Sequence, residues 1–538
     1  MDETEPVVRT AGGQVRGRMV ADVAIFRGIP FARPPVGGLR FAAPRPAEPW
    51  DGVREATAFG PPPPQSGSML TPPPPSSASG ADPDDWLTVN VFSPGLGAAG
   101  LPVMVWIYGG AYRSGAASNP GYDGTLLARQ NVVVVTFNYR VGVEGYAYLP
   151  GVPANRGLLD QVAALHWVRE NIAAFGGDPD RVTVFGESAG AGAIAALLVM
   201  PVAAGLFRRA IAQSVPGTFF SPALAADVTA AIAAAAGLPA TAEAFAAADP
   251  ARLATASDAV RPADHAARWG RVAHTDTPFS PVVDGEVLPV APWRALAMGT
   301  GRSIDLVTGH NRDEFRLFTE VAGTRRQITA EAASRALQGL APGHDGEDGE
   351  TAYRQAYPDA DLKTLFELVN SDWLFRMPSL HLAQAHAAAG GRTFLYELSY
   401  PASVAGLGAC HAIDVPLLFG VYAGLGQLFF GPEPPASAVR LGDLMRSHWA
   451  AFAADGDPGW PQYSPGRRMT RIFADPPDVA PYPERTSLHL WDQHRFGVLD
   501  LTPDPDPDPD PDPQTPQNPQ NPQKGPDRAD IRAGRLRA

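Results

Sequence analysis

The sequence predicts an α/β fold with a large, mostly parallel, twisted central sheet flanked by helices. Two observations predict it. Continuous apolar runs rich in β-branched residues, of the length of buried strands, alternate with segments whose apolar residues recur at helical spacing. In addition, 45% of the 538 residues are apolar, so the chain can bury a large core.

The alternation is clearest between residues 103 and 200. Apolar runs predict the strands, and Gly176-Gly177 marks the end of a helix before a turn at Asp178-Pro179. The expected elements are strands over 103–108, 131–138 and 182–185 and helices over 158–172 and 191–200. Strands that alternate with helices in this way are expected to pair mainly in parallel.

We expect one domain over residues 1–499 and a disordered tail over residues 500–538. No repeat or linker interrupts the chain before the tail, where Asp alternates with Pro up to Pro513 and Pro/Gln/Asn repeats follow. This segment has almost nothing apolar to bury. Calcium binding by its Asp residues is disfavoured, because Pro at every second position prevents the turn that would converge the carboxylates.

Charge and cysteine content exclude several classes of protein. The net charge of −13 opposes nucleic-acid binding, and the single cysteine, Cys410, excludes an intrachain disulfide framework and any cysteine-based metal site. The acidic N-terminus leads into no apolar signal segment, and the uncharged, Ala/Gly-rich run of residues 188–207 suits a buried helix better than a membrane span. We therefore expect a cytoplasmic protein, most simply a monomer, without nucleic-acid or membrane partners.

Gly186-Glu187-Ser188-Ala189-Gly190 stands directly between the 182–185 strand and the 191–200 helix. A G-x-S-x-G pattern at such a turn is typical of a nucleophilic serine, because the sharp turn needs small residues two positions either side. The helix would point the Ala189 N–H at the oxyanion of acyl transfer. Two other interpretations stay open here: a serine helix cap, and a dinucleotide loop from Gly190, although no acidic residue stands at the distance that loop requires.

A serine esterase needs a second backbone donor opposite the nucleophile, from a glycine-rich loop after an early strand. Tyr108-Gly109-Gly110-Ala111-Tyr112 has this position, although Gly-Gly after a strand is by itself only a turn. The base is expected on a loop after a late strand, and His411 fits best because it follows the strand candidate 394–400. The acid is expected after the strand candidate 304–308, where the residues alone leave Asp313 and Glu314 as equal candidates.

Taken in order, these segments resemble the type-B carboxylesterases, the family that includes para-nitrobenzyl esterases and cholinesterases. The similarity covers residues 7–497, and its further blocks are Phe26–Ala32, Asn138–Gly142, Asn155–Gln161 and Phe175–Pro179. The resemblance implies the α/β-hydrolase fold. This chain departs from the family at Ala111, where a third glycine is usual, and at Trp86, which stands in the place of a cysteine.

The resemblance also implies the roles of the site residues. It makes Ser188 the nucleophile, His411 the base and Glu314 the acid. The oxyanion donors are then the N–H groups of Gly110, Ala111 and Ala189, and the supporting residues are Glu187, Ser214 and Asp414. The implied activity is that of a serine carboxylesterase, which hydrolyses neutral, small-molecule carboxylic esters through an acyl-enzyme and needs no metal ion or organic cofactor.

The substrate class remains broad at this level. Residues 66–84 contain no Trp, Tyr or Phe, whereas cholinesterases hold a quaternary ammonium group on a Trp in this region, so we expect no preference for choline esters. A hydrolase for a specialised ester, such as an aromatic diester or a toxin, stays open. A non-catalytic adhesion module is disfavoured, because all three members of the triad are present.

Overall fold

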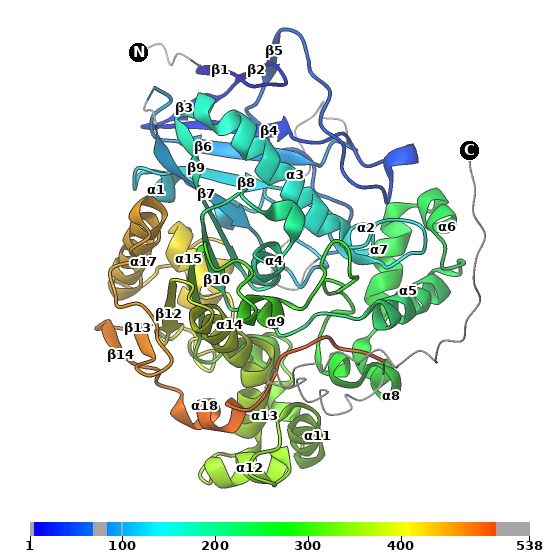
Figure 1. Cartoon of the computed structure of the whole chain (residues 1–538), viewed down its shortest axis with the longest axis vertical. Helices are drawn as coiled ribbons and strands as arrows, with labels where there is room; N and C mark the ends of the chain where they lie inside the picture. The colour runs from blue at the N-terminus through cyan, green and yellow to red at the C-terminus, as the bar shows by residue number, and fades with distance from the viewer. Residues whose placement is uncertain (1–4, 68–82, 98–99, 502–538) are drawn as a thin grey trace, which may run out of the picture.

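The computed structural model describes residues 5–67, 83–97 and 100–501 (Figure 1). Its centre is an eleven-stranded sheet in the order β14-β13-β12-β11-β10-β9-β7-β8-β6-β4-β3. The strands are β3 (Arg18–Val20), β4 (Val23–Pro30), β6 (Thr88–Ser93), β7 (Leu101–Ile107), β8 (Val133–Phe137), β9 (Gly177–Glu187), β10 (Arg209–Gln213), β11 (Asp305–Asn311), β12 (Thr393–Leu398), β13 (Met469–Phe473) and β14 (Asp478–Pro481). A separate three-stranded sheet consists of β1 (Val7–Arg9), β2 (Gln14–Arg16) and β5 (Val53–Glu55).

The middle of the large sheet is parallel. Every neighbouring pair from β13 to β8 runs parallel, and antiparallel strands join only towards the two edges. All residues of β8 and β10 are buried, as expected for strands covered on both faces. The predicted α/β class with a mostly parallel sheet is confirmed, and the antiparallel edges are an addition that the sequence analysis did not foresee.

The turn predicted at Asp178-Pro179 is wrong in part, because β9 already begins at Gly177. Against β7, Gly177 pairs with Leu101 and Val182 pairs with Val103, so residues 178–181 bulge out of the ladder. Within the bulge, the Asp180 N–H donates to Oδ1 of Asp178 at 2.9 Å. The turn-like composition therefore marks a bulge inside one long strand rather than the start of a new one.

Helices cover both faces of the sheet. In Figure 1, α3 and α4 cross in front of the strands, and α15 and α17 lie behind, where Phe419 contacts Trp106 and Phe185. The helices nearest the sheet are α1 (Thr125–Ala128), α2 (Gly142–Tyr146), α3 (Arg156–Asn171), α4 (Ala189–Leu197), α9 (Pro292–Ala297), α14 (Met377–Ala388), α15 (Asp414–Phe419), α16 (Leu425–Phe430) and α17 (Ala436–Asp455). The expected helices over 158–172 and 191–200 correspond to α3 and α4.

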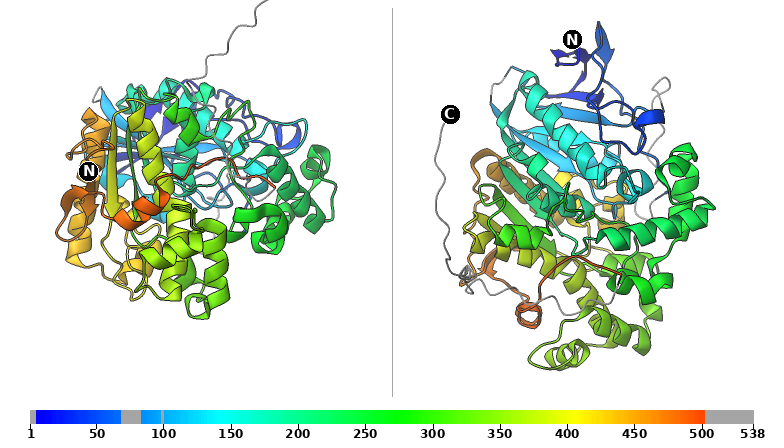
Figure 2. Two further views of the ribbon diagram at one scale, coloured as in Figure 1. Left: turned by 60° about the horizontal axis from the view of Figure 1, so that its bottom comes forward. Right: turned by 45° about the vertical axis from the view of Figure 1, so that its right-hand side comes forward.

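Two groups of helices extend away from the sheet, and the rotated views in Figure 2 separate them. The first, at the right of Figure 1, contains α5 (Pro222–Ala236), α6 (Ala242–Ala247), α7 (Pro250–Ala259) and α8 (Ala266–Trp269). The second, at the bottom of Figure 1, contains α11 (Ala330–Leu340), α12 (Gly349–Ala356), α13 (Leu362–Ser371) and α18 (Arg485–Trp491).

Buried apolar side chains from Val8 to Phe496 form one hydrophobic cluster. After it, the Leu499 N–H donates to the Phe219 carbonyl at 2.7 Å, and Ser221 Oγ donates to Asp500 at 2.8 Å. The described contacts therefore reach Asp500, and the boundary at residue 499 stays a prediction. The rest of the predicted tail, and most of segment 66–84, lie outside the described residues. Within those that are described, no helix is both long and apolar enough to span a membrane.

Candidate active site

Ser188 lies on a strained turn between β9 and α4. Its backbone has φ 58° and ψ −126°, which is unusual for a residue with a side chain. A Cβ on Gly186 would lie 2.5 Å from the Ile107 carbonyl oxygen, and one on Gly190 only 2.0 Å from it. The two glycines thus allow β7 to approach the turn, as the nucleophile-elbow pattern requires. Although Ser188 is the N-cap of α4, its hydroxyl makes no capping hydrogen bond.

Three backbone N–H groups near this turn have no acceptor in the described part of the protein. They belong to Gly110, Ala111 and Ala189, and all three residues line the same cavity as Ser188. Gly110 has φ 117°, and a Cβ there would lie 2.1 Å from the Ser114 carbonyl oxygen. Ala111 follows with φ 57°, a strained value that turns the loop. Free N–H groups beside a candidate nucleophile are the donors that an oxyanion needs.

The structure brings His411 and Glu314 into contact across 97 positions of the chain. Nδ1 of His411 lies 2.6 Å from Oε2 of Glu314, and both side chains are buried. The backbones are also paired, since the His411 N–H donates to the Glu314 carbonyl at 3.1 Å. Asp313 makes no contact with the imidazole among the described contacts; its carboxylate turns the other way. Geometry therefore distinguishes the two acids that the residues alone left equal.

Two of the predicted supporting residues hold the acid and the histidine loop. Ser214 Oγ donates to Oε1 of Glu314 at 2.6 Å, and the Asn311 N–H donates to the same oxygen at 2.8 Å. Asp414 is fully buried and accepts from Gln213 Nε2 at 2.6 Å and from Asn311 Nδ2 at 3.4 Å. The sequence analysis missed Gln213 and Asn311, although Asn311 lies in the turn that was examined for the acid.

The third predicted supporting residue, Glu187, faces the other side of the imidazole. Its Oε1 atom lies 3.0 Å from Nε2 of His411. Burial alone would lower the pKa of His411, but the carboxylates of Glu187 and Glu314 outweigh burial and raise it. Burial also raises the pKa of Glu187, although the positive charge of the His411 imidazolium acts in the opposite direction. At this separation the two groups titrate as a pair, so protonation of one changes the pKa of the other.

Two aromatic side chains hold the imidazole ring, and the sequence analysis did not find them. Phe375 stacks on His411 with ring centroids 4.2 Å apart and planes at 27°, and Phe318 lies at 5.4 Å. Phe375 belongs to the π-helical turn Asp372–Arg376 between α13 and α14. Such turns are rare and often occur at functional sites. No signal in the linear sequence marks this one.

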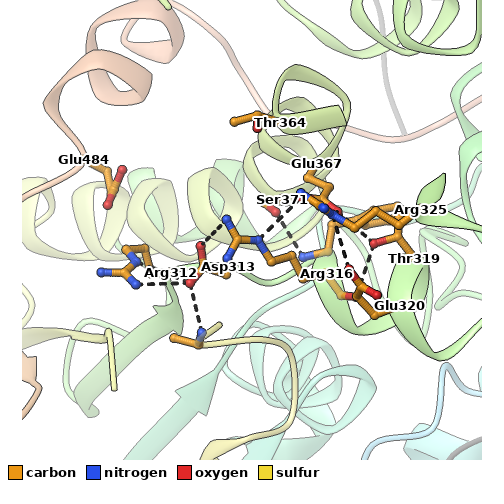
Figure 3. Close-up of polar contacts among 12 residues, drawn as sticks. Arg312, Asp313, Arg316, Thr319, Glu320, Arg325, Thr364, Glu367, Ser371 and Glu484 are labelled. Carbon is orange, nitrogen blue, oxygen red and sulfur yellow. Dashed lines mark hydrogen bonds and ion pairs between the residues drawn. The ribbon is translucent and has the colours of Figure 1, made fainter. Parts of the chain in front are cut away.

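Asp313 links the turn that carries Glu314 to the loop that carries His411, on the side away from the imidazole ring (Figure 3). Its Oδ2 accepts the Ala409 N–H at 2.9 Å, and its own N–H donates to the Ala409 carbonyl at 2.9 Å. The same carboxylate forms ion pairs with Arg312 at 3.2 Å and with Arg316 at 3.4 Å. Asp313 therefore contacts the loop that carries His411 without contacting the ring.

The ion pairs continue along α10 (Arg316–Val321), a helix that lines the cavity with Leu317, Phe318 and Val321. Nε of Arg316 lies 3.5 Å from Glu367, which is buried, and Nε of Arg325 lies 2.7 Å from Glu367 and 3.4 Å from Glu320. We call this set, Asp313, Arg316, Glu320, Arg325 and Glu367, the α10 ion-pair chain. It fixes α10 from the side facing away from the cavity.

Ser188, His411 and the three predicted oxyanion donors line a single cavity of about 250 Å³, whereas Glu314 is fully buried and contacts His411 without lining the cavity. Its walls are mostly apolar and aromatic, with Tyr112, Phe315, Leu317 and Leu374 among them. Polar side chains, including Arg113 and Asp276, lie elsewhere along the lining. A concave apolar site with a few converging polar groups is the usual form of a small-molecule site.

Comparisons with known proteins identify the family of the chain. The family model described as the carboxylesterase family matches residues 4–479. The para-nitrobenzyl esterase of Bacillus subtilis is 37% identical over 490 residues, which cover 87% of this chain and 95% of that protein. The fumonisin B1 esterase of Sphingopyxis macrogoltabida is 35% identical over 487 residues, covering 86% and 85%. A crystal structure of a Geobacillus stearothermophilus carboxylesterase superposes with a TM-score of 0.78 at 35% identity, covering 90% of this chain and 99% of that one.

Proposed function

Because the chain belongs to the carboxylesterase family and is a carboxylic ester hydrolase, we propose that it cleaves its esters by acyl transfer through Ser188. Ser188 Oγ attacks the ester carbonyl, and His411 accepts the proton at Nε2, since Nδ1 faces Glu314. The imidazolium then protonates the leaving alcohol. Water attacks the resulting acyl-enzyme with His411 again as the base, and the carboxylic acid leaves as Ser188 regains its proton.

The negative charge of each tetrahedral intermediate is bound by the N–H groups of Gly110, Ala111 and Ala189. These donors are main-chain groups held by the Gly110 turn and by the start of α4, so they need no reorganisation as charge develops. The methyl group of Ala111 adds no charge and removes no donor. The imidazolium that forms in each half-reaction is stabilised by Glu314 on one side and Glu187 on the other.

One observation supports this proposal most strongly: a strained serine, three free N–H donors and a histidine bonded to a buried carboxylate share one cavity. In the structure Nε2 of His411 faces Glu187, the residue next to Ser188. Hydrogen bonds between base and nucleophile are often long before substrate binds, so this position is compatible with the role. No step of the scheme uses a metal ion or an organic cofactor.

Replacing the nucleophile and the base tests the proposal. Ser188→Ala and His411→Ala should each lower kcat/KM for 4-nitrophenyl esters by about 10⁴-fold. The melting temperature of each variant is the control for folding. A folded Ser188→Ala protein that keeps a tenth of the wild-type turnover would exclude Ser188 as the nucleophile.

The cavity favours neutral esters with short to medium acyl chains. Its described lining contains aromatic side chains but no Trp, and its volume of about 250 Å³ suits small substrates. We expect similar kcat/KM values for butyrylcholine and for its neutral isostere 3,3-dimethylbutyl butyrate. A tenfold preference for the choline ester would reveal a cation site and would overturn this part of the proposal.

A further inference from the structure

Outside the cavity lining, two histidines and an aspartate meet where the turn before α12 touches α18. His344 and Asp345 belong to the turn, and His489 belongs to the helix. The rings of His344 and His489 lie 4.4 Å apart, centroid to centroid. One nitrogen or oxygen atom from each of the three residues lies within 4.8 Å of the other two. None of the three lines the active-site cavity.

The turn that presents His344 and Asp345 has a defined shape. His344 and Glu347 exchange two backbone hydrogen bonds, of 3.1 and 2.9 Å, and the residues between them have φ values of 49° and 86°. Positive φ at both central residues is the pattern of a tight hairpin turn of type I′. The Asp345-Gly346 pair is suited to such a turn, so the two side chains are presented from a fixed backbone.

The helix that presents His489 is also fixed. Two residues before it, Ser487 Oγ donates to buried Asp372 at 2.6 Å and lies 2.7 Å from the hydroxyl of Tyr357. Two residues after it, the Trp491 indole N–H donates to the hydroxyl of Tyr353 on α12. These buried contacts clamp α18 against α12 and hold His489 opposite His344.

The side chain of His344 is only 9% exposed, yet within the described chain neither of its ring nitrogens has a hydrogen-bond partner. Buried polar groups in proteins nearly always have one, so this imidazole calls for an explanation. Its Nε2 atom lies 3.4 Å from Oδ2 of Asp345 and faces the second imidazole. Two imidazoles and a carboxylate around an unpaired nitrogen are the ligands that divalent transition metals prefer.

We propose that His344, Asp345 and His489 bind a divalent transition-metal ion, with zinc as the preferred ion and water as the fourth ligand. Ligand atoms of a tetrahedral zinc site lie about 3.4 Å apart, given bonds of about 2.1 Å. The separation of up to 4.8 Å must therefore shorten on binding. Asp345 is 74% exposed and His489 is exposed, so both side chains are free to rotate towards His344.

Such an ion would link the loop between α11 and α12 to the last helix of the body. Its role is structural, because a ligand that binds only the folded state stabilises that state. The esterase reaction does not depend on it. Zinc binding and ester hydrolysis can therefore be tested separately, and failure of one leaves the other standing.

The test is zinc titration of the full chain after treatment with a chelator, followed by calorimetry and by thermal melting. The wild type should bind one zinc ion and melt at a higher temperature when zinc is present. His489→Ala should weaken zinc binding at least tenfold and lose the rise in melting temperature. His166→Ala, which removes an exposed histidine of α3, is the matched control and should behave as the wild type.

Because His489 is exposed, its replacement should fold, and the melting temperature without zinc checks this. Asp345→Asn provides a second variant that keeps the shape of the side chain and should also weaken binding. Equal zinc affinity in the wild type and in both variants would overturn the proposal, as would the absence of any binding by the wild type at millimolar zinc.

Discussion

Asp313 and Glu314 are neighbours in the chain, but their carboxylates belong to regions of different character. Glu314 points into a fully buried cluster, where it accepts hydrogen bonds from Ser214 and from the Asn311 N–H and contacts His411. Asp313 belongs to the α10 ion-pair chain, whose two arginines, Arg316 and Arg325, are each 30% exposed (Figure 3).

The comparison shows that a carboxylate can either act on the imidazole or hold the surrounding backbone, depending on its environment. In the buried cluster the side chains are shielded from bulk solvent, so each interaction with the imidazole is strong. In the ion-pair chain, solvent and salt weaken each pair, so its effect on the site is to position the histidine loop and α10 rather than to act on the reacting atoms. The four predictions below distinguish these uses.

Replacing Glu314 should have the largest effect. Glu314→Gln keeps the size of the side chain but removes the charge that orients the Nδ1–H of His411 and stabilises the imidazolium, so kcat should fall by about 10³- to 10⁴-fold. Steady-state kinetics on a 4-nitrophenyl ester measures it. A loss smaller than that caused by Asp313→Asn would reverse the comparison and move the acid to Asp313.

Removing the charge of Glu187 should change the pH dependence. The base acts when His411 is neutral, and the carboxylate of Glu187 raises the pKa of the imidazolium. In Glu187→Gln that pKa falls, so the rise of kcat/KM with pH should shift to lower pH by about 1 unit. A pH profile of kcat/KM for both proteins checks the sign. A shift to higher pH would contradict the electrostatic role given to Glu187.

Asp313 should matter less, and through geometry. Asp313→Ala removes the carboxylate that accepts the Ala409 N–H and that pairs with two arginines. The loop that carries His411 is then held less firmly, so kcat should fall by about tenfold. Asp313→Asn keeps an acceptor oxygen and should lose less. Comparison of kcat, KM and the pH profile separates positioning from general destabilisation: the acid limb should stay in place in both variants. If it moves by as much as in Glu187→Gln, Asp313 acts electrostatically instead.

The outer end of the ion-pair chain should contribute least. Arg325→Gln leaves Glu367 with Arg316 at 3.5 Å and with the hydroxyl of Thr319 at 2.9 Å, so kcat should change less than about twofold and stability by about 1 kcal/mol. Urea unfolding at low and high salt measures the latter, with Arg354→Gln on the exposed face of α12 as the control. Loss of activity comparable to that of Asp313→Ala would show that α10 depends on its outer end.

The fold was largely predictable because its central signals are local. Buried parallel strands appear as apolar runs, and β7, β8 and α3 were predicted from such patterns. Glycines at 186 and 190 could be connected to Ser188 through the local G-x-S-x-G pattern, although the carbonyl that a Cβ would meet belongs to Ile107 on β7. The bulge at residues 178–181 was not predictable, since the same composition forms either a turn or an extra loop within a strand.

The site residues were predictable only where a sequence motif or the family resemblance indicated them. Nothing local separates Asp313 from Glu314, because their difference arises from which way each side chain points once β11 ends. Phe375 and Gln213 reach the site from distant elements, and a single sequence holds no record of such contacts. The same holds for His344 and His489, which are 145 positions apart and meet only because α18 packs on α12.

The central claim is that Ser188 carries the acyl group, and trapping the intermediate tests it most directly. A slowly hydrolysed substrate, such as 4-nitrophenyl trimethylacetate, is mixed with the enzyme, quenched in acid, and the protein is digested and examined by mass spectrometry. The account predicts a burst of nitrophenolate close to one equivalent and an acyl group on the peptide that contains Ser188, both absent in Ser188→Ala. An acyl group on another residue, or an undiminished burst in Ser188→Ala, would contradict it.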